Sequence, residues 1–156
     1  MFICLESNMN RDSHLTNNPA NFTCSLPENY VLNQGLKSGK WHIGLLELAT
    51  PPLKEGEKSD GLYVFCSVCE PSCIGDTYRQ VLATLSLGEI KRNSCLRFDS
   101  VNYVPLRVSN LSEVNIQICS GDGKPLRELL SIKNEALTSR CTLELKWIQT
   151  TSPWLP

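Results

Sequence analysis

The feature that most constrains the fold is a series of short apolar or alternating runs, each closed by Gly, Pro, Asn or Ser. Such runs are typical of β-strands, whereas an amphipathic helix needs apolar residues at i, i+3, i+4 and i+7. This criterion predicts strands at Phe2–Leu5, Phe22–Leu26, Trp41–Ala49, Leu62–Val68, Val81–Leu87, Leu96–Phe98, Tyr103–Val108, Val114–Cys119 and Thr142–Gln149. Eight or nine short strands with few helices predict an all-β sandwich or barrel.

Several local signals refine this prediction. Trp41–Ala49 should stop before Pro51-Pro52, because proline removes a ladder donor. Val81–Leu87 also fits a helical face, but we favour a strand because polar and apolar residues alternate in it. The best helix candidate is Leu126–Leu137, with Leu126, Leu129, Leu130 and Ile132 on one face and Asn134 near its end.

The length of 156 residues suits one domain, since domains run to roughly 100–200 residues. We expect this domain to cover residues 1–149, with residues 150–156 forming a C-terminal tail. Fifteen Lys and Arg against sixteen Asp and Glu leave a net charge of −1, without the basic excess of a nucleic-acid binder. No apolar stretch is long enough to span a membrane, and Glu6 interrupts the short apolar start, so we expect neither membrane insertion nor secretion.

The eight cysteines are expected to be free thiols of a reducing compartment. Cys66, Cys69 and Cys73 have the one metal-like spacing, with Cys95 as the nearest fourth ligand. In a strand, however, Cys66 and Cys69 would point to opposite faces. We therefore predict no metal site and no cofactor.

No catalytic constellation is apparent, so we predict that the protein is not an enzyme. His42 lies within a predicted strand and His14 in a polar stretch, and neither is next to a cysteine. Gly121-Asp122-Gly123-Lys124 lacks the spacing of a phosphate-binding loop and is better explained as a hairpin turn, with Gly123 as a structural residue.

The tail carries Pro153, Trp154 and Leu155, a stiff apolar hook with little conformational entropy to lose on docking. Two interpretations are open. Trp154 either folds back on its own domain or anchors the tail on a neighbouring subunit, since aromatic residues dominate interfaces. We take these three residues as candidate oligomer or partner contacts.

The order of motifs resembles a known family. The motif-bearing segments are Phe2–Asn8, Asn18–Phe22, Leu26-Pro27, Leu36, Trp41–Pro51, Phe98–Leu106, Val114–Ile118 and Gly121–Leu126. They include Trp-x-x-Gly-Leu-x-Glu, Tyr-x-Pro-Leu and Ile-x-Ile strands in that order. Nearly the whole chain thereby resembles the single jelly-roll minor capsid (penton) proteins of adenovirus-related elements, the Polintons, adintoviruses and adomavirus-like viruses. The chain departs from the family at Cys119-Ser120, where an acidic residue is more usual, and in its many cysteines.

The resemblance implies a single jelly roll: two antiparallel sheets, about eight strands and at most one or two short helices. It implies a structural virion protein that forms a homo-oligomer, with a pentamer favoured, and contacts a major capsid protein. Assembly would take place inside the host cell, in the nucleus.

Five further residues receive structural roles in this picture. Trp41 should pack against the core, Trp147 should help to fill it, and Gly44 should allow a close approach. Tyr103 and Pro105 should lie near a sheet edge, because proline is poorly tolerated in a central strand.

Two alternatives stay open. One is a trimeric jelly-roll binding module of the tumour-necrosis-factor or complement C1q type, which has a similar strand count and length. The other is a zinc-stabilised regulatory β-domain that uses the cysteine cluster.

Overall fold

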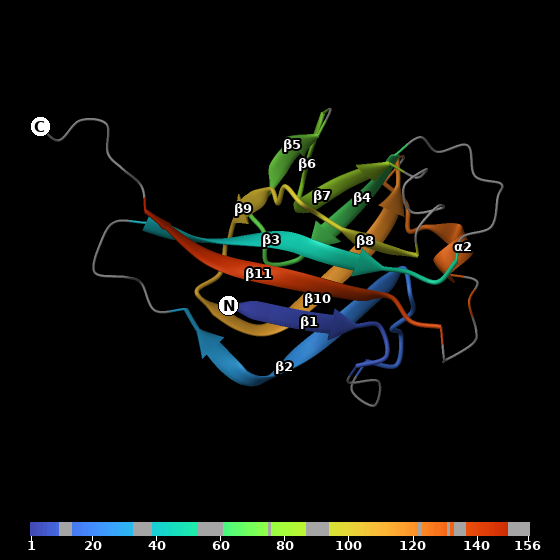
Figure 1. Ribbon diagram of the computed structural model, residues 1–156, viewed down its shortest axis with the longest axis horizontal. Helices are drawn as coiled ribbons and strands as arrows, with labels where there is room; N and C mark the ends of the chain where they lie inside the picture. Colours follow the sequence, from blue (N-terminus) through green and yellow to red (C-terminus); the bar gives the residue numbers. More distant parts are fainter. Residues whose placement is uncertain are drawn as a thin grey trace, which may run out of the picture.

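Strands dominate the architecture, as the alternating pattern predicts (Figure 1). The computed structural model describes residues 1–9, 14–32, 39–52, 61–74, 76–86, 94–121, 123–130, 132 and 137–149, with the backbone alone at 27–31 and 128. The strands in these ranges are β1 Phe2–Glu6, β2 Asn21–Val31, β3 Gly39–Ala49, β4 Gly61–Cys66, β5 Ser72–Ile74, β6 Thr77–Arg79, β7 Val81–Ser86, β8 Cys95–Arg97, β9 Tyr103–Pro105, β10 Asn110–Ser120 and β11 Arg140–Gln149. The described helix is α2, Arg127–Leu130.

The strands form two principal antiparallel sheets. Sheet A has the order β1-β11-β3-β8, with β9 also paired to β3, and sheet B has the order β2-β10-β4-β7. A separate hairpin joins β5 and β6, and it projects from one side of the molecule (Figure 1). The first and last strands of the described residues are neighbours in sheet A, where Phe2 of β1 pairs with Glu144 of β11.

The core lies between the two sheets. Alternate residues point inward, so that Leu143 and Leu145 of β11 and Ile116 and Ile118 of β10 are almost completely buried. Each such side chain contributes about 1.5–3 kcal/mol of transfer free energy. The prediction of an all-β protein with antiparallel sheets is therefore confirmed, and the shared core is that of a β-sandwich.

The nine predicted strands all occur, with boundaries shifted by a few residues. β7 confirms the strand interpretation of Val81–Leu87 over the helical one within the described part, which ends at Ser86. β3 ends at Ala49, directly before Thr50 and Pro51-Pro52, as expected. The hairpin of β5 and β6 was not predicted.

The predicted helix, Leu126–Leu137, is longer than the helix that the structure shows among the described residues. Only Arg127–Leu130 is helical, and residues 131 and 133–136, including the predicted stop at Asn134, lie outside the described residues. Leu126 and Leu129 are buried as expected, but Leu130 is 43% exposed. A single helical turn presents too narrow a face to bury all three leucines. No helix in the described ranges is long and apolar enough to cross a membrane.

Candidate functional site

The two tryptophans of sheet A lie together at one end of the sandwich. Their rings meet edge to face with centroids 5.8 Å apart and an interplanar angle of 70°. Trp41 packs against the core, as predicted. Trp147 does not fill the core, because this end of β11 extends past the core. Trp147 is therefore only partly buried. Together with Trp41 and Leu106 it lines a cavity of about 230 Å³.

Gly44 allows the close approach that the sequence predicted. A Cβ atom on Gly44 would lie 2.4 Å from Cγ1 of Val101 and 3.0 Å from the ring of Tyr103. The segment that carries Val101 and Tyr103 therefore packs directly on the backbone of β3. No side chain larger than hydrogen fits between them without movement.

Tyr103 and Pro105 lie in β9, which pairs with β3 alone among the described strands and so confirms their position near a sheet edge. Pro105 lies opposite His42, and its carbonyl accepts the backbone N–H of Glu70 at 2.8 Å. Proline is tolerated here because an edge strand can do without one ladder donor.

A polar cluster on the outer surface of sheet A joins Tyr103 to β11. The Tyr103 hydroxyl donates to the carboxylate of Glu144, and Lys146 donates to the same hydroxyl at 2.6 Å. The Tyr103 hydrogen bond and the Lys146 ammonium, 3.2 Å away, lower the pKa of Glu144. The hydrogen bonds to the Tyr103 hydroxyl and to the Glu144 carboxylate in turn raise the pKa of Lys146. A comparable arrangement of Arg97 and Arg140 lowers the pKa of Glu47.

β1 forms an open edge of sheet A. Met1 and Leu145 exchange two backbone hydrogen bonds, of 3.0 and 2.8 Å. Bonded and non-bonded pairs alternate along an antiparallel ladder, so Phe2 and Cys4 direct their N–H and C=O groups away from β11. No other described strand pairs with that side of β1, and Phe2 is 67% exposed.

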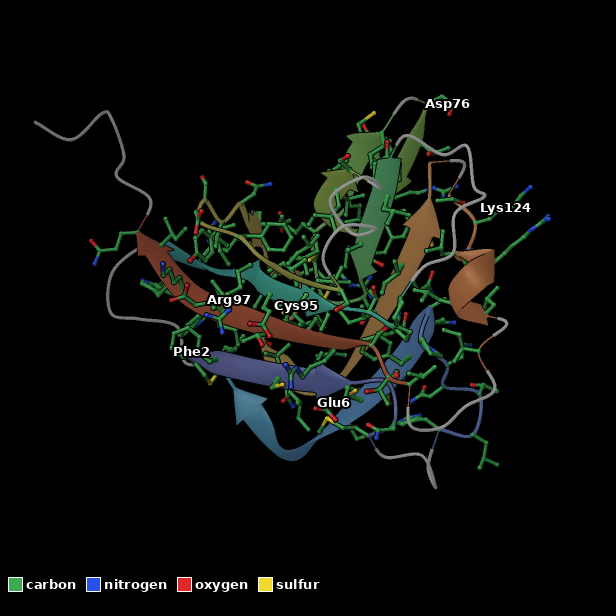
Figure 2. The ribbon with its side chains drawn as sticks, turned by 45° about the vertical axis from the view of Figure 1, so that its right-hand side comes forward. Phe2, Glu6, Asp76, Cys95, Arg97 and Lys124 are labelled. Carbon is green, nitrogen blue, oxygen red and sulfur yellow. The ribbon has the colours of Figure 1, made fainter. Side chains whose placement is uncertain are left out.

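The opposite edge of sheet A is formed by β8 and β9. Cys95 and Arg97 of β8 are exposed, and the Arg97 side chain is held by the Glu47 carboxylate at 2.9 Å. Figure 2 shows Phe2 and Glu6 at the two ends of β1, with Cys95 and Arg97 marking β8. The sequence placed Tyr103 and Pro105 of β9 near an edge, but it did not single out β1 or β8 as edge strands. The sequence does show that Phe2–Leu5 lacks protection against pairing with another chain. It contains neither proline nor a charged residue, which commonly protect edge strands.

Gly123 occupies the turn predicted after β10. Its φ is +77°, and its N–H donates to the Ser120 carbonyl at 2.8 Å. A Cβ atom on Gly123 would lie 2.2 Å from Nη1 of Arg79. The glycine therefore suits the left-handed backbone, and a larger side chain at this position would displace the Arg79 guanidinium.

All eight cysteines lie within the described residues, and no disulfide joins any two of them. Five are buried, namely Cys24, Cys66, Cys69, Cys119 and Cys141. Burial raises the pKa of Cys24 to about 11, and burial also raises that of Cys141, which makes these thiols poor nucleophiles. Hydrogen bonding to Cys66 and burial raise the pKa of the Cys69 thiol. Among the described residues, no group of three His, Cys, Asp or Glu side chains could hold a metal ion.

Both histidines make local hydrogen bonds. Nδ1 of His42 contacts the Lys40 carbonyl at 2.9 Å, and Nε2 of His14 contacts the Ser25 hydroxyl at 2.9 Å. His42 lies within β3 and is therefore a strand residue, as predicted. The candidate contact residues Pro153, Trp154 and Leu155 lie outside the described residues.

No protein-family model and no curated protein matches the chain.

Proposed function

We propose that the protein is a structural virion protein, a minor capsid subunit of the penton-like vertex type. It self-assembles and contacts a major capsid protein. The single observation that carries this proposal is the order of the strands in the two sheets.

The strand order supports a single jelly roll. If β8 and β9 are counted together and the small β5–β6 hairpin is set aside, eight strands remain in the described part of the chain. In sheet A, the first strand (β1) lies beside the last (β11), and the third (β3) lies beside the sixth (β8 with β9). In sheet B, the second strand (β2) lies beside the seventh (β10), and the fourth (β4) lies beside the fifth (β7). Two Greek keys folded over one another produce this nested order.

The edges of sheet A support lateral assembly. An unprotected strand such as β1 offers hydrogen-bonding groups to another chain. In sheet A, β1 runs antiparallel to β8, because each successive neighbour in the order reverses direction. The β1 edge of one copy can therefore meet the β8 edge of the next in an antiparallel, head-to-tail contact. Such a contact builds a ring when its rotation closes.

The resemblance in the sequence adds the biological setting. In this proposal a homo-pentamer closes at the capsid vertex, beside the major capsid protein of the same virus. Assembly takes place in the nucleus of the host cell, and the protein resides in the virion. Neither nucleic acid nor membrane is among its partners.

Native mass spectrometry of the purified full chain tests the proposal. We expect a species of five subunits, which dissociates to a folded monomer on dilution. Three subunits would instead favour the trimeric binding module, which the same strand order accommodates. A monomer at every concentration would contradict self-assembly.

A further inference from the structure

A groove of about 390 Å³ lies on the outer surface of sheet B, away from sheet A. Its floor is formed by Phe65 of β4 and by Asn115 and Gln117 of β10, which alternate with buried neighbours. Tyr78 of the β5–β6 hairpin and Arg107, which follows β9, also line it. We refer to this site as the sheet B groove.

Two arginines line the groove, and backbone carbonyls hold both in place. The Arg79 guanidinium lies 5.7 Å from the centre of the Phe65 ring, and its Nη1 donates to the Gly123 carbonyl at 3.2 Å. Nε of Arg107 donates to the Ser67 carbonyl at 2.9 Å. A carbonyl orients a guanidinium but does not neutralise it, so both positive charges remain.

The charge in the groove is uncompensated by the described residues. Elsewhere Lys40, Arg97, Arg140 and Lys146 each pair with a carboxylate. Neither arginine of the groove has such a partner in the described ranges, and no lining residue is acidic. Asp76 lies apart, at the tip of the β5–β6 hairpin (Figure 2).

The amide side chains of the groove are fixed by hydrogen bonds. Asn115 donates to Asn21 and Thr23, both at 2.9 Å, and Gln117 donates to Asn115 at 3.1 Å. Gln80 donates to the Ser67 carbonyl at 2.9 Å. The NH₂ groups are thereby engaged, while no hydrogen bond from a described residue reaches the side-chain oxygens of Gln80 and Gln117, which can accept from a ligand.

The geometry points to a binding site for an acidic saccharide. Guanidinium groups bind a carboxylate or sulfate through paired hydrogen bonds, and the amide oxygens accept from sugar hydroxyls. The exposed Tyr78 ring offers a flat apolar surface to the C–H face of a sugar ring. Pro71 is the one aliphatic residue among the described lining residues, so the groove lacks the cluster of aliphatic side chains that anchors a peptide. This inference stands independently of the capsid role.

Binding of free saccharides to the full chain tests the inference. Calorimetric titration would use sialyllactose as the carboxylated ligand, a heparin disaccharide as the sulfated ligand and lactose as the neutral one. We expect at least one acidic ligand to bind, with lactose at least about tenfold weaker, because hydrogen bonds to charged groups are the strong ones. Preference for sialyllactose or for the heparin disaccharide identifies the anion as carboxylate or sulfate.

Substitutions locate the site. Arg79→Gln and Arg107→Gln should each weaken binding of the acidic ligand about tenfold or more. Arg97→Gln on sheet A makes the same change in net charge and should leave binding unchanged. Unaltered thermal midpoints would show that the variants are folded.

Several results would overturn the inference. They are the absence of acidic saccharide binding at millimolar concentration, equal binding of lactose, and equal loss of affinity in Arg97→Gln. Arginine-dependent binding of a hexaglutamate peptide with no binding of the saccharides would also exclude the assignment.

Discussion

A single hydrogen atom at Gly44 sets the distance between β3 and the segment that covers it. Replacement by alanine would place a methyl group 2.4 Å from Val101. We expect Gly44→Ala to lower the free energy of unfolding by about 1–3 kcal/mol, the usual cost of overpacking. Urea denaturation measures this loss. Gly61→Ala is the matched control, because its Cβ would lie 3.9 Å from the nearest atom, and equal destabilisation of the two variants would refute the packing argument.

The Tyr103 hydroxyl controls the charge cluster on sheet A. Its hydrogen bond is the main cause of the low pKa of Glu144 and of the high pKa of Lys146. We expect Tyr103→Phe to raise the pKa of Glu144 and to lower that of Lys146, as measured by NMR titration. A lowered carboxyl pKa stabilises the fold above the pKa of the unfolded chain, and this contribution is lost as the pH falls through the folded value. Unfolding experiments should therefore show a smaller loss of stability in acid for the variant, and unchanged pKa values would contradict the assignment.

Individual residues were predictable where one physical requirement decided their role. Gly44, Gly123 and Pro105 were such cases, since each reflects a backbone constraint. Trp147 was not, because alternation gives the face of a strand but not the point at which a strand leaves the core.

At the scale of elements, the free edge of β1 makes a specific prediction. Cys4→Pro removes a backbone N–H that points away from β11, and it leaves the ladder to β11 intact. We expect this variant to fold normally and to lose about 1 kcal/mol per subunit contact, which analytical ultracentrifugation would detect as weaker assembly. Cys4→Ser keeps the N–H and should assemble normally. Wild-type assembly of Cys4→Pro would rule out β1 as a contact.

The exposed thiols of Cys4 and Cys95 lie on the two edges that we expect to meet. A short bis-maleimide should therefore join neighbouring copies into a ladder of covalent oligomers on a denaturing gel. The ladder should vanish in Cys4→Ser and in Cys95→Ser and persist in Cys73→Ser, which alters an exposed thiol on the β5–β6 hairpin. A ladder that survives loss of Cys4 would show that the subunits meet elsewhere.

The longer strands were predictable because each buries one face. Residues 114–118 of β10 and residues 141–145 of β11 place every second side chain in the core, and this alternation is visible in the sequence. The β5–β6 hairpin has no buried face: its residues are exposed or half-buried, so no apolar pattern marks it. The Gly75-Asp76 pair between the two strands was the available turn signal.

At the scale of the whole molecule, the sequence does not reveal which strands pair. β1 and β11 meet although nearly the entire chain separates them, and local patterns carry no information about such pairing. The sheet B groove was missed for the same reason. Phe65, Arg79, Arg107 and Gln117 come from separate segments, and only the fold brings two arginines together without a carboxylate among the described residues.

The central claim is that copies of this chain close into a vertex ring through the edges of their sheets. Averaged electron micrographs of the assembled protein test it most directly. We expect rings with five-fold symmetry whose subunits touch along the β1 and β8 edges. Three-fold particles, open filaments or isolated subunits would contradict the claim.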